Sequence, residues 1–329
     1  MPQALLIGGT RFIGRHTVQE FREHGYDVAL FNRGNHENPF ADDPEIEHIE
    51  GDRTNDSALE AARSTVAPDV VVDLVAYKPR EVETAVSVFE DLDAYVYISS
   101  GAAYGDEEIP KREDETRLFE CTAEEAVDDS GSSYGPRKAE GDRIVARAAE
   151  RGVNAMSIRP PIVYGPHDYT DRFAYWIDRV ATHDRVLVPG DGTNLWHRAY
   201  AGDVASGIRT IAEAGSPGES YNVGDRTAPT MSGMVELLAA ALETDVELVP
   251  ASERELSVAD LSLEDFPLYR DPPHLLSTEK LASIGWEATP LAESMAASVA
   301  AYRERQDPTI EPGPDRETEE RVLEVLDTL

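Results

Sequence analysis

The stretch Gly8–Gly14 reads GGTRFIG and directly follows the apolar run QALLI at residues 3–7. An apolar strand that enters clustered glycines and then a helical pattern is the usual opening of a dinucleotide-binding fold. Gly8 allows a tight turn, Gly14 lets the helix pack on the sheet, and the first N–H groups of the helix can bind a pyrophosphate. A glycine-rich turn also joins ordinary strands to ordinary helices, and Arg11 stands where a third glycine is expected. The stretch alone therefore leaves both interpretations open.

Apolar segments alternate with helical segments through the first half of the chain. Because most of the strand segments are apolar throughout, we expect a parallel sheet that is covered on both faces. The fold class predicted is α/β, a doubly wound parallel sheet of the Rossmann type with a smaller C-terminal α+β substrate lobe. The expected strands lie at residues 3–7, 27–31, 46–52, 68–75, 94–100 and 154–160, with a helix at about 132–151.

The second half of the chain is less regular, with Pro and Gly clusters between a few helical stretches. We expect a dinucleotide-binding domain at residues 1–165 and a substrate-binding lobe at 166–329. The segment YNVG within residues 219–224 could be a strand that returns to the main sheet. A Pro-rich linker at 306–315 leads to an amphipathic C-terminal helix, RETEERVLEVLDTL, whose apolar face is expected to dock on the body.

The charge balance is strongly acidic, with 64 Asp and Glu residues against 30 Lys and Arg residues and a formal net charge of −34. Such a surface disfavours nucleic acid and anionic membranes as partners. Its self-repulsion weakens the folded state unless salt screens it, because the Debye length falls to about 3 Å at 1 M salt. The composition therefore predicts a halophile protein from a salt-rich cytoplasm.

Cysteine usage and the ends of the chain predict a cytoplasmic protein. Cys121 is the only cysteine, so it cannot form an internal disulfide, and we expect it to pack as a small apolar residue. The N-terminus runs straight into the first strand without a signal sequence, and no segment is apolar enough to span a membrane. The scattered histidines form no metal-binding motif, so no metal is expected. The oligomeric state stays open, with a homodimer as one alternative.

The end of the second strand bears on which cofactor is bound. An NAD site usually offers an acidic residue about 20 residues after the glycines, to hold the ribose 2′-OH, but this chain has Asn32 followed by Arg33. A neutral side chain beside a guanidinium suits a 2′-phosphate, and Arg11 would help to bind it, so NADP is slightly favoured over NAD. The alternative is that Arg11 is an exposed loop residue or pairs with a carboxylate. Asp52, after the third strand, is either a hydrogen-bond acceptor for adenine or an ordinary turn residue.

The sequence SSYGPRKAEGD contains the residues that point to chemistry. Tyr134 and Lys138 are four residues apart on a predicted helix, so both side chains lie on one face. A phenol is a weak base at neutral pH, but an adjacent ammonium stabilises the phenolate. SSGAAYG, which begins at Ser99, follows the fifth strand, where a hydroxyl partner for the pair is expected.

Together, GGTRFIG, GDR, YVYISSGAAYG, YGPRK and RPPIVYGP resemble the extended short-chain dehydrogenase/reductase superfamily, in particular the NAD-dependent epimerase/dehydratase family. The likeness spans nearly the whole chain, since HRAYAGDVASGI, YNVGD and LSTEKLASIGWEATPL also match pieces of that family.

The resemblance implies a role for several residues. It makes Tyr134 the general acid/base, Lys138 the residue that lowers the pKa of Tyr134 and holds the nicotinamide ribose, and Ser100 the hydrogen-bond partner of the reacting hydroxyl. It places Ala76 and Pro160 beside the cofactor. Arg198 is either a phosphate ligand in the substrate lobe or a surface arginine. The full set of expected cofactor-binding residues is Gly8, Thr10, Arg11, Phe12, Ile13, Gly14, Asn32, Arg33, Asp52, Arg53, Ala76, Tyr134, Lys138 and Pro160.

Two departures from the family pattern resemble an atypical subgroup, which includes proteins described as RNA-binding in chloroplasts. Arg11 replaces the middle glycine, and the fourth strand reads DLVAY in place of a His-Leu-Ala-Ala-like sequence. A non-catalytic dinucleotide-binding protein is therefore one alternative to an enzyme. RNA binding requires a basic track, and the sequence contains none, so nucleic acid is not expected as a partner.

Among the reactions of the family, 4,6-dehydration uses an Asp-Glu pair directly after the hydroxyl residue, where this chain has Gly101 and Ala102. Epimerisation of a nucleotide sugar needs only hydride removal, rotation of the keto-sugar and hydride return, which the three side chains can support. An NADP-dependent carbonyl reductase with the same three residues is the alternative reaction.

Overall fold

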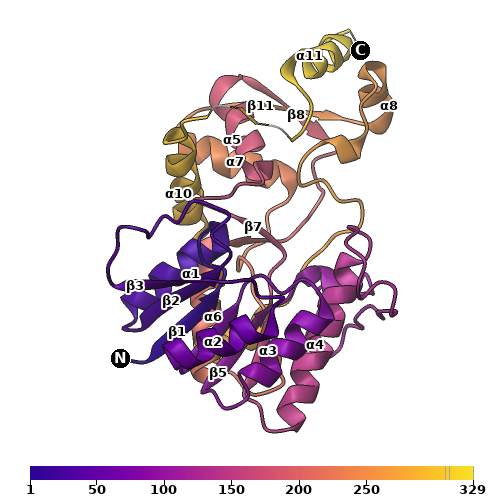
Figure 1. The fold of residues 1–329 in the computed structure, drawn as a ribbon. Coiled ribbons are helices and arrows are strands. Elements are labelled where there is room, and N and C mark those ends of the chain that lie inside the picture. Colours follow the sequence, from indigo (N-terminus) through magenta and orange to yellow (C-terminus); the bar gives the residue numbers. More distant parts are fainter. Residues whose placement is uncertain (308, 311, 329) are drawn as a thin grey trace. The chain divides into compact units, whose positions relative to one another are not determined.

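A computed structural model of the chain describes residues 1–307, 309–310 and 312–328 and divides into two compact units (Figure 1). Pro308 and Glu311 of the expected linker, and Leu329 at the C-terminus, lie outside the described residues. Unit 1 comprises Met1–Val163, Ala201–Gly224 and Leu276–Ala288, and unit 2 comprises Tyr164–Tyr200, Asp225–Leu275 and Thr289–Leu329. Two segments of the expected substrate lobe, Ala201–Gly224 and Leu276–Ala288, thus belong to unit 1.

Unit 1 contains a parallel sheet of seven strands in the order β10-β6-β5-β4-β1-β2-β3. The order reverses direction between β1 and β4, which confirms the predicted doubly wound Rossmann architecture. Its strands are β1 (Gln3–Ile7), β2 (Asp27–Asn32), β3 (Ile46–Glu50), β4 (Val70–Asp73), β5 (Ala94–Ile98), β6 (Ala155–Arg159) and β10 (Ser220–Asn222).

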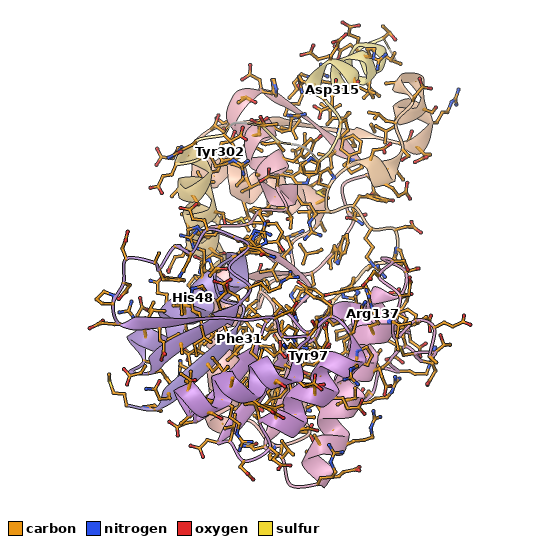
Figure 2. The ribbon with its side chains drawn as sticks, in the orientation of Figure 1. Phe31, His48, Tyr97, Arg137, Tyr302 and Asp315 are labelled. Carbon is orange, nitrogen blue, oxygen red and sulfur yellow. The ribbon has the colours of Figure 1, made fainter. Side chains whose placement is uncertain are left out.

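Helices cover both faces of this sheet. α2 (Asp56–Val66), α3 (Pro79–Val88) and α4 (Tyr134–Glu150) form one layer, and α1 (Phe12–Glu23) packs against α6 (Ala201–Ala214) in the other (Figure 1). The first layer encloses a large apolar core, to which Phe31 of β2 and Tyr97 of β5 contribute (Figure 2). Burial on both faces explains why strands such as β4 and β5 are apolar at almost every position.

Short connections set the ends of the helices in unit 1. The side chain of Asn55 accepts a hydrogen bond from the Ser57 amide and caps α2, and Pro79 begins α3. A 3₁₀ turn, η1 (Gly101–Ala103), directly follows β5. Helix α9 (Glu279–Ser283) packs near β10, the strand at the edge of the sheet opposite to β3. Three segments that the sequence singled out follow strands of this sheet: the glycine turn follows β1, the segment DLVAY starts at the last residue of β4, and the turn of Ser100 follows β5. All three therefore lie at carboxyl ends of strands.

Unit 2 is smaller and contains β8 (Arg185–Pro189) paired in parallel with β11 (Glu247–Ala251). β7 (Ile162–Tyr164), which includes the boundary between the units, pairs with β9 (Arg198–Tyr200). The helices of unit 2 are α5 (Arg172–Thr182), α7 (Met231–Leu242), α8 (Glu253–Leu256), α10 (Leu291–Arg303) and α11 (Arg316–Leu326), together with the 3₁₀ turns η2 (Ser257–Ala259) and η3 (Leu263–Asp265).

The C-terminal helix α11 is attached to unit 2 by a buried charge as well as by apolar packing. Asp315 caps the helix by accepting a hydrogen bond from the Thr318 amide at 2.8 Å (Figure 2). Glu319 is almost fully buried, and its Oε1 accepts a hydrogen bond from Arg179 Nε of α5 at 2.8 Å. Val322 and Leu323 complete the buried face. An ion pair in this position ties α11 to α5, because an unpaired buried carboxylate would be costly.

Cys121 and the apolar segments are two further features to which the sequence drew attention. Cys121 is half-buried in the long connection before α4, so it is only partly shielded from solvent. No helix in the described part of the chain combines the length and apolarity of a membrane span.

Candidate active site

The turn between β1 and α1 brings the backbone unusually close to itself. Gly8 and Gly9 have φ angles of 112° and 97°, which side chains rarely tolerate. A Cβ added to Gly14 would lie 2.7 Å from the Cα of Gly9, so only glycine lets α1 approach the turn this closely. No side chain caps α1, and its first turn contains no acidic residue. A helix start with these properties fits the phosphates of a dinucleotide.

Arg11 occupies the N-cap position of α1, and its side chain is exposed. Phe12, the next residue, is buried with a φ of 31°, a conformation that is unfavourable for a residue with a side chain. Thr10 and Ile13 are half-buried beside them. Arg11 thus adds an exposed cation at the start of the helix.

The carboxyl end of β2 is organised around the amide of Asn32. Its Oδ1 accepts a hydrogen bond from the Gly34 amide at 2.9 Å and lies 3.0 Å from His48 Nε2, and its Nδ2 donates to the Gly8 carbonyl at 3.4 Å. Arg33 is exposed next to it. Glu50, the register partner of Asn32 on β3, places its carboxyl group against Gly34. Opposite charges therefore flank the end of β2.

Asp52 and Arg53, which follow β3, behave differently from each other. Asp52 is exposed, and its Oδ1 accepts hydrogen bonds from the Thr54 amide at 2.9 Å and from the Thr54 hydroxyl at 2.8 Å, as a turn residue does. These hydrogen bonds lower the pKa of Asp52. The guanidinium of Arg53 is buried and pairs with the carboxylate of Asp73 at the end of β4. The Arg53 side chain is thus engaged with a carboxylate of the protein, and its expected contact with a cofactor stays a prediction.

Asp73 is the centre of this internal network. Its Oδ2 also accepts a hydrogen bond from the Tyr95 hydroxyl at 3.1 Å, and Arg53 Nη1 lies 3.8 Å from Glu81 Oε2. Sequence reasoning missed this network, although a single carboxylate inside the apolar run VVVDLV was a visible signal. The residue that departs from the family pattern in DLVAY therefore has a structural partner on the neighbouring turn.

Ser100 begins the 3₁₀ turn η1 at the carboxyl end of β5. Its Oγ accepts a hydrogen bond from the Ala102 amide at 3.2 Å, which leaves the hydroxyl proton available to an acceptor. The next amide, that of Gly101, donates to the Pro160 carbonyl at 2.8 Å. Pro160, which follows β6 directly, is buried. The turn that carries Ser100 is thus held by the neighbouring strand.

Lys138 is almost fully buried, and its ammonium group joins the ends of two strands. Nζ donates to the Ala76 carbonyl after β4 at 2.8 Å and to the Ile98 carbonyl of β5 at 2.7 Å. The rings of Tyr97, Tyr77 and Tyr134 surround it, with centroids 4.8, 5.2 and 5.8 Å from Nζ. Burial lowers the pKa of Lys138 to about 8, against the opposing effect of the Asp73, Asp142 and Glu81 carboxylates.

Tyr134 is the first residue of α4 and is half-buried. A Cβ added to the following residue, Gly135, would lie 2.5 Å from the Ala102 carbonyl oxygen, so the start of α4 packs directly on η1. Tyr134, Lys138 and Ser100 therefore come together at the carboxyl ends of β4 and β5, as the sequence suggested. Such a group can exchange a proton with a ligand hydroxyl near neutral pH, because the ammonium stabilises a phenolate.

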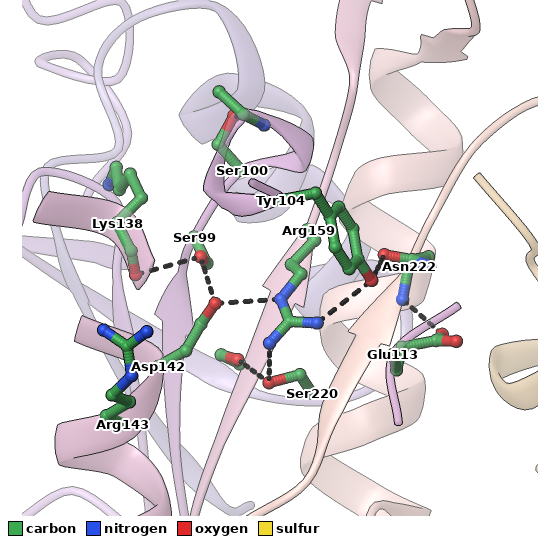
Figure 3. A network of polar contacts seen from close by, with 12 residues as sticks. Ser99, Ser100, Tyr104, Glu113, Lys138, Asp142, Arg143, Arg159, Ser220 and Asn222 are labelled. Atoms are coloured by element: carbon green, nitrogen blue, oxygen red, sulfur yellow. Dashed lines mark hydrogen bonds and ion pairs between the residues drawn. The ribbon is translucent and has the colours of Figure 1, made fainter. Parts of the chain in front are cut away.

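A second buried network lies behind these three residues and was also missed from the sequence (Figure 3). Asp142 of α4 accepts hydrogen bonds from the Ser99 hydroxyl at 2.9 Å and from Arg159 Nε at 2.8 Å. Arg159 also donates from Nη1 to the Tyr104 hydroxyl at 3.0 Å. The signal was a lone arginine at the end of the apolar strand segment NAMSIRP.

Arg198, the residue suggested for the substrate lobe, is buried in unit 2 and donates from Nη2 to the Pro229 carbonyl at 2.6 Å. The alternative that it is a surface arginine is therefore wrong. Within the described residues, no group of three His, Cys, Asp or Glu side chains could hold a metal ion.

Comparisons with known proteins place this geometry in a family. The chain is 27% identical over 297 residues to the chloroplast stem-loop binding protein of 41 kDa b of Arabidopsis thaliana, covering 86% of this chain and 74% of that protein. It is 24% identical over 331 residues to mouse dTDP-D-glucose 4,6-dehydratase, covering 92% of this chain and 88% of that enzyme.

Among solved structures, it resembles dTDP-glucose 4,6-dehydratase of Bacillus anthracis in complex with NAD, with a TM-score of 0.72 at 19% identity over 93% of this chain and 98% of that one. That likeness supports the fold. Residues 4–224, which include every candidate residue in unit 1, match the model of one protein family. The chain belongs to the NAD dependent epimerase/dehydratase family.

Proposed function

We propose that this protein is an NAD(P)-dependent epimerase, or a related oxidoreductase, that acts on a nucleotide sugar. The observation that carries the proposal is the buried ammonium of Lys138, which lies beside Tyr134 at the end of β5 and near the turn of Ser100. A lysine that is fixed by two carbonyls and surrounded by tyrosines has a high cost of burial, which a purely structural role would not require. Mouse dTDP-D-glucose 4,6-dehydratase, a relative over nearly the whole chain, acts by its name on a nucleotide sugar.

Each of the three side chains has a role in moving a proton. The Tyr134 phenolate accepts the proton of a substrate hydroxyl as that carbon is oxidised, and returns it in the reverse step. The Ser100 hydroxyl hydrogen-bonds the same oxygen and orients it. The Lys138 ammonium stabilises the phenolate and would hold the ribose of a bound cofactor. When bound, a nicotinamide dinucleotide supplies the hydride acceptor and donor.

The glycine turn, Arg11 and Arg33 are the groups proposed to hold the cofactor. Two exposed arginines near the end of β2 and the start of α1 favour the extra phosphate of NADP, and the neutral amide of Asn32 does not repel it. The Glu50 carboxyl beside Gly34 opposes this preference and keeps it small. The acidic surface is proposed to be an adaptation to salt, as in a halophile cytoplasm.

Dehydration is the less favoured reaction of the family for this chain. The turn after Ser100 is formed by Gly101, Ala102 and Ala103, so it offers no carboxylate to remove or return a proton. Epimerisation, or simple reduction of a carbonyl with NADP, needs only the three side chains and the cofactor. The two reactions differ in whether the cofactor is regenerated within one turnover.

A second candidate function is non-catalytic binding, and the similarity to a stem-loop binding protein favours it. Under that function the dinucleotide would be a structural or redox-sensing ligand. The net charge of −34 opposes binding to a phosphate backbone. Fluorescence anisotropy with a labelled RNA stem-loop over a range of salt concentrations separates the two functions.

The deciding experiment combines ligand identification with turnover. Ligand released from the purified protein is identified by mass spectrometry, and the protein is incubated in molar KCl with UDP-glucose or dTDP-glucose and either cofactor. We expect a nicotinamide dinucleotide and a chromatographically distinct epimer without net change in absorbance at 340 nm. Net oxidation of NADPH with a carbonyl substrate would establish the reductase instead. Stem-loop binding without turnover of any substrate would establish the binding protein.

A further inference from the structure

The buried network behind Lys138 contains two charged residues to which neither the family resemblance nor the proposed reaction gives a role. Asp142 follows Lys138 by four residues, as Lys138 follows Tyr134, so all three lie on one face of α4. Asp142 and Arg159 are each about 3% exposed, which leaves little solvent to screen their charges. A buried ion pair is costly to form, and its retention in this position calls for an explanation.

Arg159 connects three separate segments of unit 1 (Figure 3). Its Nε donates to Asp142 of α4 at 2.8 Å, its Nη1 to the Tyr104 hydroxyl at 3.0 Å, and its Nη2 to Ser220 Oγ of β10 at 2.9 Å. Tyr104 directly follows η1, and its hydroxyl donates in turn to Asn222 Oδ1 at 2.8 Å. The planar guanidinium of Arg159 thus connects the helix that carries Tyr134 and Lys138 to the turn that begins at Ser100.

Asp142 has contacts on the side of the catalytic residues as well. Its Oδ2 accepts the Ser99 hydroxyl at 2.9 Å, and Ser99 immediately precedes Ser100. Ser99 Oγ also lies 3.5 Å from the Lys138 carbonyl. The Asp142 carboxylate therefore ties the middle of α4 to the end of β5, next to Lys138 and to the turn of Ser100.

We propose that Asp142 and Arg159 are positioning residues of the active site, in which Asp142 supplies a fixed negative charge that supports the Lys138 ammonium, and Arg159 aligns α4 with the turn of Ser100. This proposal rests on the proposed function only for its consequence in catalysis. Neither side chain is placed in contact with a substrate or cofactor.

The charges around Lys138 determine what removal of Asp142 should do. Negative charge comes from Asp142 on α4, Asp73 at the end of β4 and Glu81 on α3. Opposing positive charge comes from Arg53, and from Arg159, which pairs with Asp142 at 2.8 Å and would lose its counter-charge with it. Burial raises the pKa of Tyr97 well above its ordinary value, so the ring nearest to Lys138 stays neutral in this pH range. Loss of one of three carboxylates leaves the ammonium less supported, so Lys138 should lose its proton at a lower pH.

The chain has only four lysines, so this titration can be observed without a substrate. Protein labelled with ¹³C at the lysine ε position gives four signals, and that of Lys138 is assigned by its loss in Lys138→Arg. In the parent protein we expect a midpoint near pH 8. Asp142→Asn keeps the size and the acceptor oxygen and should lower the midpoint by about half a pH unit or more. Asp142→Glu keeps the charge and should leave the midpoint near its parent value.

A matched control removes a buried carboxylate elsewhere. Glu319 of unit 2 is as buried as Asp142 and is likewise paired with an arginine, so Glu319→Gln tests the general effect of losing such a pair. Its Lys138 midpoint should equal that of the parent protein. An unchanged or raised midpoint in Asp142→Asn would overturn the role of Asp142, whether or not any nucleotide sugar is turned over.

The arm from Arg159 to the turn is tested by Tyr104→Phe, a mild change that removes one hydroxyl and leaves the ion pair intact. Hydrogen exchange measured by mass spectrometry should become about tenfold faster in the peptide that covers residues 100–105, because the turn loses its hydrogen bonds to Arg159 and Asn222. Exchange in α4 should stay unchanged, because the helix keeps its ion pair between Asp142 and Arg159. Equal exchange in the turn of Tyr104→Phe and the parent protein would overturn the role of Arg159. This variant also decides the proposal if Asp142→Asn does not fold.

Discussion

The two regions proposed to contact the cofactor handle charge in opposite ways. At the ends of β1 and β2, the cations of Arg11 and Arg33 are exposed. Around the start of α4, Lys138 and Arg159 are buried and held by carbonyls, carboxylates and hydroxyls. Exposed charges can change without disturbing the fold, whereas each buried charge depends on partners from other strands. The first region is thus suited to adjusting which ligand binds, and the second to holding reactive groups in one arrangement.

The largest expected effect is on turnover, in the buried region. Tyr134→Phe keeps the ring and removes the proton acceptor, so turnover of a nucleotide sugar should fall by about 100-fold to 10,000-fold. Cofactor affinity should change little, because the phenol acts on the substrate. Steady-state kinetics and calorimetry with NAD or NADP measure the two quantities. Undiminished turnover would remove the proposed mechanism and with it the functional distinction between the two regions.

The next effect is on stability and follows from the pKa of Lys138, which burial lowers to about 8 from 10.5. Between these two pH values the unfolded chain binds a proton that the folded protein does not, so folded-state stability should rise with pH across this window. The shift corresponds to about 3 kcal/mol as an upper value. Lys138→Met should lose this pH dependence, which denaturant unfolding at pH 7 to 10.5 would measure. It should also weaken cofactor binding, unlike Tyr134→Phe. Parallel pH profiles for the parent and the variant would contradict the buried charge.

In the exposed region, the expected effect is on ligand preference. If Arg33 binds a 2′-phosphate, NADP should bind more tightly than NAD, and Arg33→Ala should remove the preference at a cost of about 1.5 to 3 kcal/mol. Glu50→Gln removes the opposing carboxyl and should shift the preference towards NADP. Calorimetry on both variants checks the two directions, and thermal melting without ligand should barely change. Equal or tighter binding of NAD in the parent protein would return Arg11 and Arg33 to ordinary surface cations.

The smallest effect per charge is that of salt on the whole acidic surface. The net charge of −34 predicts a free energy of unfolding that rises from low salt to molar KCl, because added ions screen the repulsion between exposed carboxylates. The buried pair of Asp142 and Arg159 lies out of reach of this screening. Unfolding midpoints measured over that range provide the test, and a flat profile would remove the inference of adaptation to salt.

Local patterns in the sequence were enough for the fold, while the catalytic roles of Tyr134, Lys138 and Ser100 came from the family resemblance and stay predictions. GGTRFIG after an apolar strand, the fully apolar strands, and the spacing of Tyr134 and Lys138 are features that neighbouring residues create through backbone geometry and helical periodicity. The position of Ser100 followed from the rule that loops at the carboxyl ends of parallel strands share one edge of the sheet. The sequence by itself also set the acidic character, which no tertiary contact can change.

Only the tertiary structure decided which charges are used inside the protein. Arg53, which was expected at the cofactor, pairs with Asp73, and Asp142 pairs with Arg159, which also binds Tyr104 behind the candidate site. The partners are separated by 17 to 55 residues in the chain and come from strands whose neighbours depend on the order of the whole sheet. A charged residue in an apolar run shows that a partner must exist, because an unpaired buried charge is costly, but its identity is set by strand order rather than by local sequence.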